Sequence, residues 1–184
     1  MALQAVSPMS LALRNILFTI VVPGAGGAYV PWLILTRHGP LPAPAAWYAA
    51  PVIVIGIGLY AWCVGVFAVV GRGTPGLWDA PRRFVAAGPY RWVRNPIYIA
   101  AVFIVSGEAW LFGSLAVLEY AAGLAVACHL FVVGYEEPHL HARFGEPYDA
   151  YRRAVNRWIP HPGSWPRGGP GGARPTPSGA PCPR

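Results

Sequence analysis

The chain has 184 residues, of which 55% are hydrophobic and only 11% are charged, whereas an ordinary soluble domain is about 25% charged. So little polar surface excludes a water-soluble globule. The formal net charge of +7 comes from fourteen basic residues, all of them arginine. A basic excess is typical of proteins that bind nucleic acid or an anionic membrane surface, and the long apolar runs favour the membrane. We therefore expect an all-α membrane protein with the lipid bilayer, and no nucleic acid, as its partner.

Four apolar segments predict about four transmembrane helices. The first, residues 15–36, contains a Pro-Gly-Ala-Gly-Gly stretch that predicts a kink. The second, residues 45–70, carries no charge and exceeds the roughly 20 residues that cross a bilayer. Apolar character resumes at Pro96 and continues to Gly134, which is too long for one helix. We therefore expect a helical hairpin with its tip at residues 110–114.

The C-terminal part of the chain is more polar. Residues 136–157 mix charged and apolar side chains at a spacing that suits amphipathic helices on a membrane surface. Residues 162–184 are rich in Pro, Gly and Arg, which predicts a disordered tail. The expected organisation is one integral membrane domain over residues 1–161, followed by the tail.

The distribution of arginine predicts the orientation. Four spans place the N-terminus, the connector at residues 71–95 and the C-terminal region on one side, which then holds thirteen of the fourteen arginines. Cytoplasmic loops of membrane proteins carry the excess of Lys and Arg. We expect both termini and the active site to face the cytoplasm. The arginine-, glycine- and proline-rich composition suggests a bacterial inner membrane.

The cysteines and histidines give no sign of a metal site. Cys63 and Cys128 lie inside apolar runs, and their spacing suggests neither a disulfide framework nor zinc ligation. His139 and His141 are too poorly spaced for a metal motif. His129, within the fourth apolar segment, is interpreted as a packed core histidine, and no metal is predicted.

Two polar segments, at residues 88–98 and 136–145, flank the expected hairpin and must therefore be neighbours on the same side of the membrane. They contain Gly-Pro-Tyr, then Arg-Asn-Pro-x-Tyr, then Glu-Glu-x-x-Leu-x-x-x-Phe-Gly-x-x-Tyr-x-x-Tyr, and an Ile-Pro pair follows at residues 159–160. In this order and at this spacing the motifs resemble the isoprenylcysteine carboxyl methyltransferase family and the related phospholipid methyltransferases. The resemblance covers roughly residues 71–160.

The resemblance implies an S-adenosylmethionine site between the start of the third helix and the end of the fourth. Arg94 would hold the cofactor carboxylate through a bidentate fork, and Asn95, where the family often has His, would contact adenine or ribose. Tyr90 and Tyr98 would pack on the adenine or face the sulfonium. Glu136, favoured over its neighbour, would accept from the ribose or the ammonium. The predicted cofactor-binding residues are Arg83, Phe84, Val85, Tyr90, Arg94, Asn95, Pro96, Ile97, Tyr98, Glu136 and Glu137.

Each of these residues also has a purely structural interpretation. Arg94 suits a lipid phosphate, Asn95 suits a cap for the helix that begins at Pro96, and Tyr98 suits an interfacial tyrosine. The acidic pair suits a helix N-terminus, because Pro138 directly follows it. Alignment of the cofactor and the acceptor is assigned to Arg94 and Tyr98, and no residue is assigned as a catalytic base.

The predicted function is methylation of a lipophilic small molecule or lipid, with no obligate protein partner. Val132 lies one helical turn before Glu136, where the protein-methylating enzymes carry an arginine for the substrate carboxylate. We therefore expect a small isoprenoid acid, a thiol or a phospholipid amine as the acceptor, and not a prenylated protein. The alternatives are a membrane NADPH-dependent sterol or enone reductase and a non-enzymatic membrane scaffold.

Overall fold

The structure is a computed structural model that describes residues 13, 17, 19, 23–71, 85–160 and 165. Within these residues it is helical, with no strand. The α-helices are α2 (Val30–Thr36), α3 (Ala50–Val66), α4 (Pro96–Leu111), α5 (Leu115–Phe131), α6 (Glu137–Phe144) and α7 (Glu146–Ala154). The all-α prediction is confirmed.

Short 3₁₀ or π-helical turns join or extend several of these α-helices, so that they form longer continuous helices. A 3₁₀ turn and a π-helical turn extend α3, so that one apolar helix runs over Trp47–Val70. A π-helical turn at Val132–Glu136 joins α5 to α6 in a second helix, Leu115–Phe144. Both are long and apolar enough to cross a membrane, whereas Ala25–Thr36 and Pro96–Leu111 are shorter apolar helices. The Pro-Gly-Ala-Gly-Gly stretch of the first segment overlaps a π-helical turn at Ala25–Tyr29. Most of residues 15–22 lie outside the described part of the chain, so the kink stays a prediction.

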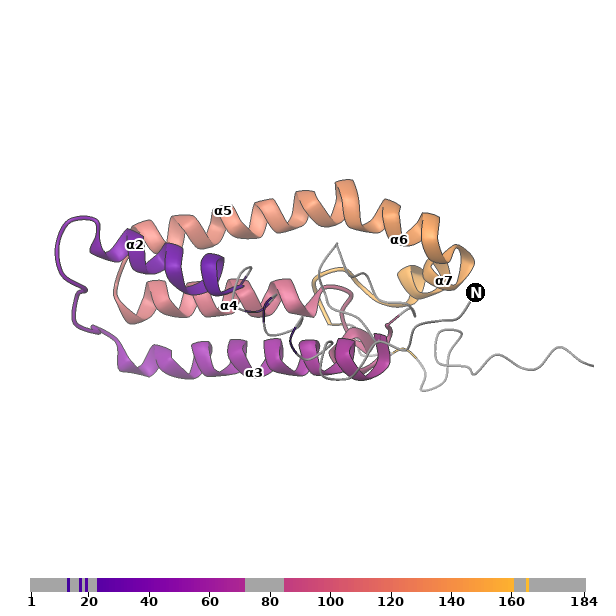
Figure 1. The fold of residues 1–184 in the computed structure, drawn as a ribbon, viewed down its shortest axis with the longest axis horizontal. Coiled ribbons are helices and arrows are strands. Elements are labelled where there is room, and N and C mark those ends of the chain that lie inside the picture. The colour runs from indigo at the N-terminus through magenta and orange to yellow at the C-terminus, as the bar shows by residue number, and fades with distance from the viewer. Residues whose placement is uncertain are drawn as a thin grey trace, which may run out of the picture.

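Figure 1 shows α3, α4 and α5 side by side, with α2 alongside them at one end and α6 and α7 at the other. The predicted hairpin is confirmed, because α4 and α5 are joined by the short turn Phe112–Ser114. Gly113 adopts a φ of +59°, and the Ser114 hydroxyl accepts a hydrogen bond from the backbone of Val117 at 3.3 Å. Glycine at positive φ and serine at the N-cap explain why the chain reverses here.

Glycines set the close approach of α3 to α4. A Cβ on Gly56 would lie 2.8 Å from Ile104 Cγ1, and a Cβ on Gly107 would lie 2.6 Å from Ile53 Cγ1. Neither helix could carry a larger side chain at these points without moving the other. Gly58 also lies on α3, but it faces open space.

The predicted amphipathic helices are α6 and α7, separated by Gly145 at a φ of +57°. The apolar side chains of α7 are buried against the protein itself. A cluster there contains Tyr148, Tyr151, Val155 and Trp165. Trp165 is the one described residue of the predicted tail, and the rest of residues 162–184 lies outside the described part of the chain.

Candidate active site

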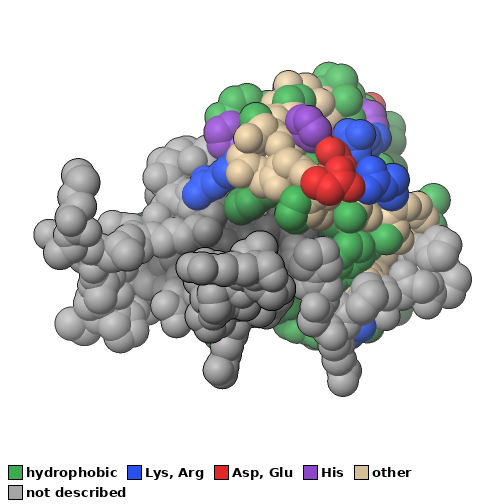
Figure 2. Space-filling model, turned by 90° about the vertical axis from the view of Figure 1, so that its right-hand side faces the viewer, with side chains coloured by type: hydrophobic (Ala, Val, Ile, Leu, Met, Phe, Trp, Pro, Cys, Tyr) green, Lys and Arg blue, Asp and Glu red, His purple; other side chains and the backbone are tan. Residues whose placement is uncertain are grey.

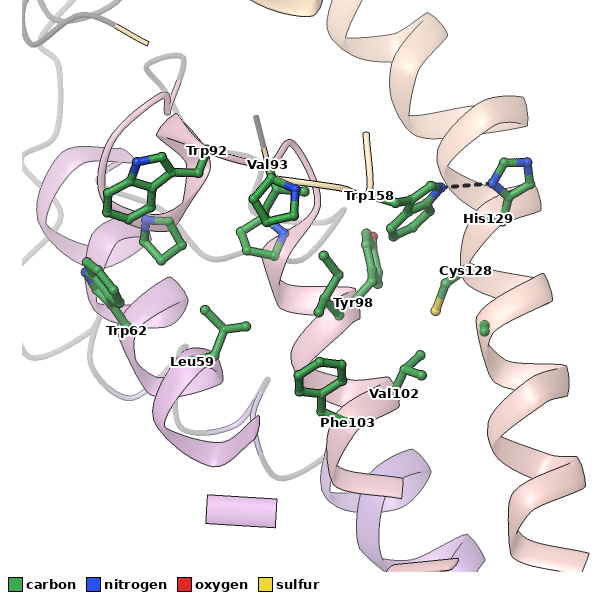
Figure 3. Close-up of a pocket in the computed structure, with 15 residues that line it drawn as sticks. Leu59, Trp62, Trp92, Val93, Tyr98, Val102, Phe103, Cys128, His129 and Trp158 are labelled. Carbon is green, nitrogen blue, oxygen red and sulfur yellow. Dashed lines mark hydrogen bonds between the residues drawn. The ribbon is translucent and has the colours of Figure 1, made fainter. Parts of the chain in front are cut away.

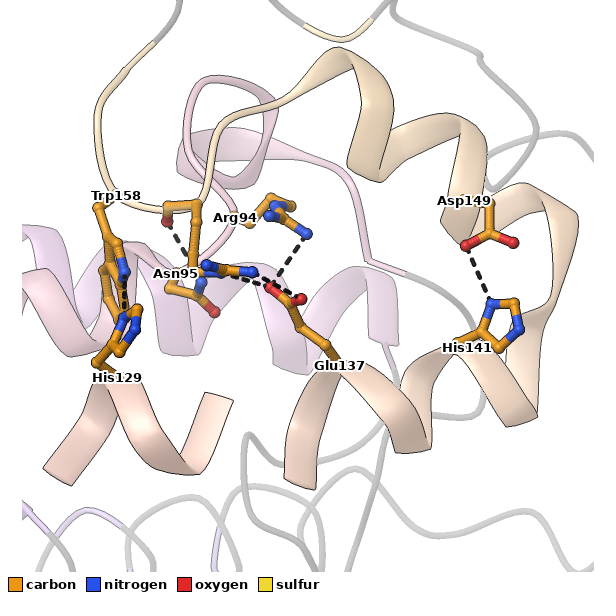
Figure 4. Close-up of polar contacts among 8 residues, drawn as sticks. Arg94, Asn95, His129, Glu137, His141, Asp149 and Trp158 are labelled. Atoms are coloured by element: carbon orange, nitrogen blue, oxygen red, sulfur yellow. Dashed lines mark hydrogen bonds and ion pairs between the residues drawn. The ribbon is translucent and has the colours of Figure 1, made fainter. Parts of the chain in front are cut away.

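The two polar segments that flank the hairpin meet at the α6–α7 end of the bundle (Figure 4). Arginine, histidine and acidic side chains gather on this end of the molecule, as Figure 2 shows in a view along the bundle. The expected proximity of residues some forty positions apart is therefore found, and its cause is the reversal between α4 and α5.

The Gly-Pro-Tyr segment forms a 3₁₀ turn, Gly88–Arg91, that packs against α3. Gly88 has a φ of +56°, and a Cβ there would lie 2.7 Å from Val66 Cγ2 and 3.1 Å from Trp62 Nε1. Tyr90 is buried, and its carbonyl accepts a hydrogen bond from the Tyr151 hydroxyl at 2.6 Å. Burial raises the pKa of Tyr90 well above its ordinary value, so its hydroxyl stays protonated. The turn is thus fixed between α3 and α7.

Arg94 is nine-tenths buried, with only 10% of its side chain exposed. Its backbone N–H donates to Asn156 O at 2.9 Å, and Nη1 lies 3.1 Å from Glu137 Oε1. The latter contact is an ion pair without hydrogen-bond geometry, because neither Nε nor Nη1 has a hydrogen-bond partner among the described residues. Two buried donors without acceptors are costly, and because Nε–H and the Nη1 hydrogens point in different directions, each needs an acceptor of its own.

Glu137 is held by a second arginine. Arg157 donates to its two carboxylate oxygens at 2.7 Å and 3.0 Å, a bidentate pair that raises the pKa of Arg157. Burial, with the negative charge of Glu137 as the next cause, raises the pKa of the adjacent Tyr148 to about 12. One carboxylate therefore faces two guanidinium groups, which leaves the cluster of Arg94, Glu137 and Arg157 with an excess positive charge.

Asn95 and Pro96 begin α4 as the sequence suggests, with proline at the first helical turn. The Asn95 side chain makes no capping hydrogen bond. It is buried and instead donates from Nδ2 to the carbonyl of Arg157 at 3.3 Å. The capping interpretation is therefore wrong for the side chain, which reaches across to the C-terminal segment.

The Tyr98 hydroxyl donates to Glu136 Oε2 at 2.9 Å. Glu136 ends the π-helical turn Val132–Glu136, directly before α6. Pro138 lacks an N–H and would interrupt an ordinary α-helix, but the wider turn preceding it lets the helix continue without a break. Such π-helical turns are frequent at functional sites, and this one directs Glu136 and Glu137 to different partners.

An apolar cavity of about 810 Å³ lies between α3, α4 and α5, beside this polar cluster. Figure 3 shows Trp62 and Trp92 on one side of it, Phe103 on α4, and Cys128 and His129 on α5. Tyr98 belongs to both regions, because its ring lines the cavity and its hydroxyl binds Glu136. The lining residues are Leu59, Trp62, Pro89, Trp92, Val93, Pro96, Tyr98, Ile99, Val102, Phe103, Ala125, Cys128, His129, Trp158 and Pro160.

A family model described as phospholipid methyltransferase matches residues 45–147, more than half of the chain. The chain belongs to the phospholipid methyltransferase family. This family is related to the isoprenylcysteine carboxyl methyltransferases, so the resemblance found in the sequence is confirmed. No curated protein and no solved structure matches the chain. The protein is therefore an integral membrane methyltransferase of a family whose members use S-adenosylmethionine.

The family match ends before two residues that the sequence reasoning missed, Arg157 and Trp158. Both directly precede, as an Arg-Trp pair, the Ile-Pro pair that marks the end of the motif series. Trp158 Nε1 donates to His129 Nδ1 at 3.1 Å. The interpretation of His129 as a packed core residue is wrong, because its side chain is exposed on α5. Periodicity did not reveal this, since an apolar helix in a membrane is apolar on all sides.

The remaining predicted cofactor-binding residues of this phospholipid methyltransferase family member are Arg83, Phe84, Val85, Pro96 and Ile97. Val85 is buried with Tyr90, and Ile97 packs against the same group of side chains. Pro96 lines the cavity together with Tyr98. Arg83 and Phe84 lie outside the described residues. Among the described residues, no group of histidine, cysteine and acidic side chains is arranged to hold a metal ion.

Proposed function

We propose that this protein transfers a methyl group from S-adenosylmethionine to a lipophilic small molecule or lipid at the cytoplasmic face of the membrane. The observation that carries the proposal is the double role of Tyr98, which lines the apolar cavity and binds Glu136, the chain neighbour of Glu137 in the polar cluster. A membrane methyltransferase needs these two environments in contact, since its cofactor is charged and its acceptor is apolar.

The polar cluster suits the cofactor. The buried guanidinium of Arg94, whose Nε has no hydrogen-bond partner among the described residues, offers a donor to its carboxylate, and Glu136 and Glu137 offer acceptors for ribose hydroxyls or the ammonium group. Asn95 directly follows Arg94 in the chain, and Tyr90 lies four residues before it. When bound, the cofactor supplies a methyl group already activated by a sulfonium leaving group. The work left to the side chains is to align the reactants and to exclude water.

The apolar cavity suits the acceptor. Its volume falls within the range of small-molecule sites, and its lining is almost entirely aromatic and aliphatic. No carboxylate is among the lining residues, and the Tyr98 proton is directed at Glu136. A carboxylate acceptor needs no base, and a thiol needs none in the cavity once it has ionised and released its proton to water. An isoprenoid acid or a thiolate therefore suits this lining better than a phospholipid amine. Val132 is 1% exposed and offers no cation to a substrate carboxylate.

The alternative functions receive less support. A sterol or enone reductase would need a site for NADPH, and the family match favours methyl transfer. The cytoplasmic orientation rests on the asymmetry of arginine, which Cys-accessibility labelling of the connector at residues 71–95 would test. A connector labelled from outside would reverse the proposed orientation.

A radiolabelled methyl-transfer assay tests the function. Protein purified in detergent would be incubated with methyl-tritiated S-adenosylmethionine and separate panels of isoprenoid acids, lipophilic thiols and phospholipids. We expect label in the acid or thiol panel, and loss of that label in Tyr98→Phe and Glu136→Gln protein. Label in none of the panels would contradict the proposed acceptor class. Turnover of farnesylcysteine analogues alone would indicate that the acceptor is a prenylated protein after all.

A further inference from the structure

The segment that follows α7, residues 156–160, carries two adjacent side chains that serve different parts of the site. Arg157 binds both carboxylate oxygens of Glu137 within the polar cluster. Trp158 lines the apolar cavity, and its indole donates to His129 on α5. Figure 3 shows the Trp158 ring between α5 and Tyr98, with its nitrogen directed at His129. The segment is therefore a wall of the cavity as well as a support of the polar cluster.

The two ends of this wall are held differently. On the Arg157 side, Arg94 N donates to Asn156 O at 2.9 Å and Asn95 Nδ2 donates to Arg157 O at 3.3 Å, in addition to the bidentate ion pair with Glu137. Past Arg157, the segment reaches α5 through the hydrogen bond from Trp158 to His129 at 3.1 Å.

The contact with His129 is well suited to opening. The two rings are 6.0 Å apart and tilted by 39°, so they are not tightly stacked. The hydrogen bond is exposed, and a single neutral hydrogen bond contributes little net free energy. Its loss would free the indole while Arg157 still holds the backbone.

We propose that Trp158, held by His129, is the movable wall of the apolar cavity and determines which lipophilic groups the cavity admits. The link between this selection and catalysis rests on the proposed function, in which the cavity binds the methyl acceptor. The selection itself is a property of the cavity and exists without cofactor or acceptor. Trp158 is thus a specificity-determining residue, and His129 is a positioning residue that acts through it.

Cys128 provides a direct probe, because it lines the same cavity one residue before His129. Purified protein would be treated with maleimides of increasing size, from N-ethylmaleimide to N-(1-pyrenyl)maleimide, and labelling at Cys128 would be quantified by peptide mass. Site-specific detection makes it unnecessary to replace Cys63 or Cys182. The measured quantity is the rate of labelling by the pyrenyl reagent divided by the rate of labelling by the ethyl reagent. A low ratio means that the cavity excludes the larger reagent.

We expect the wild-type protein to exclude the bulky reagent relative to the small one. Trp158→Ala should raise the ratio by about tenfold or more, since the wall itself is removed. His129→Leu and Trp158→Phe each remove one partner of a single hydrogen bond, so each should raise the ratio about two- to tenfold. The double variant should resemble either single one, because both break the same contact. His129→Gln keeps a hydrogen-bond acceptor and should stay close to wild type.

Val126→Ala, on the exposed surface of α5 and not among the cavity-lining residues, is the matched control and should leave the ratio unchanged. Equal ratios for His129→Leu and His129→Gln would overturn the role of the hydrogen bond. If Trp158→Ala protein elutes as a folded species and still shows the wild-type ratio, Trp158 is not the wall that selects by size. Neither result depends on methyl transfer, so a failure here is distinguishable from a failure of the proposed function, which calorimetry with S-adenosylhomocysteine tests.

Discussion

The Tyr98 hydroxyl lies 2.9 Å from Glu136 Oε2, while the ring of Tyr98 forms part of the apolar cavity wall. This pair connects α4 to the π-helical turn that precedes α6, two segments 38 residues apart in the chain. It is one of two points at which the polar and apolar halves of the site touch, the other being the adjacent residues Arg157 and Trp158. The consequences can be tested one side chain at a time.

Tyr98→Phe keeps the ring in the cavity and removes the donor to Glu136. Because the carboxylate would lose a hydrogen-bond partner in a largely buried position, we expect the free energy of unfolding to fall by about 1–3 kcal/mol. Unfolding in a mixed-detergent titration measures this. Tyr135→Phe is the control, since that tyrosine is 47% exposed and should change stability by less than about 0.5 kcal/mol. If Tyr98→Phe and the wild-type protein were equally stable, the hydrogen bond between Tyr98 and Glu136 would not stabilise the fold.

Glu137→Ala leaves Arg94 and Arg157 facing each other without their shared carboxylate. We expect a loss of about 3–5 kcal/mol of unfolding free energy, as for other buried ion pairs from which one partner is removed. Replacing Arg157 by Leu in the same protein should recover part of this loss, because one of the two uncompensated charges disappears.

The control for this prediction is Glu146→Ala. Its ion pair with Arg153 is 2.6 Å long but the Glu146 side chain is 75% exposed, so the change should stay within about 1 kcal/mol. If the Glu137→Ala and Glu146→Ala proteins were equally stable, the buried ion-pair cluster would add no more to the free energy of unfolding than an exposed ion pair does.

Gly107→Ala tests the close contact between α3 and α4. The added methyl would meet Ile53 Cγ1 at 2.6 Å and Ile53 N at 3.2 Å, which we expect to destabilise the protein by about 1–3 kcal/mol. Gly58→Ala meets nothing within 4 Å and should be neutral or stabilising by up to about 1 kcal/mol, because alanine favours the helix. The same unfolding titration compares them, and a stabilised Gly107→Ala protein would exclude tight packing at this position.

The arrangement of the helices followed closely from the sequence where the signal was strong and local. The uncharged second segment and the Gly113-Ser114 reversal are both found near the expected positions. The glycine that approaches α4 was less predictable, because Gly56 and Gly58 differ only in the direction in which α3 presents them. That direction depends on packing between helices, which an apolar sequence without a polar face does not encode.

The candidate site was predicted in its parts but not in its connections. The motifs indicated that Arg94 and Glu136 share one pocket, whereas the ion pair of Arg94 is with Glu137. Nothing in the spacing predicted that Arg157 joins this pair. Pro138 suggested that a new helix begins, and α6 does begin at Glu137, but the π-helical turn keeps it continuous with α5. Long-range contacts made by an irregular segment, such as those of Trp158, leave no periodic pattern in the sequence.

The measurement that tests the central claim most directly is calorimetric titration of the detergent-purified protein with S-adenosylhomocysteine, in wild-type and Arg94→Ala form. We predict saturable binding to wild type and a loss of about 1.5–3 kcal/mol in the variant, since charge-assisted hydrogen bonds are lost. Arg153→Ala, whose side chain is 66% exposed, should bind as wild type does. Equal affinity of Arg94→Ala and wild type, or binding of NADPH without binding of S-adenosylhomocysteine, would contradict the account.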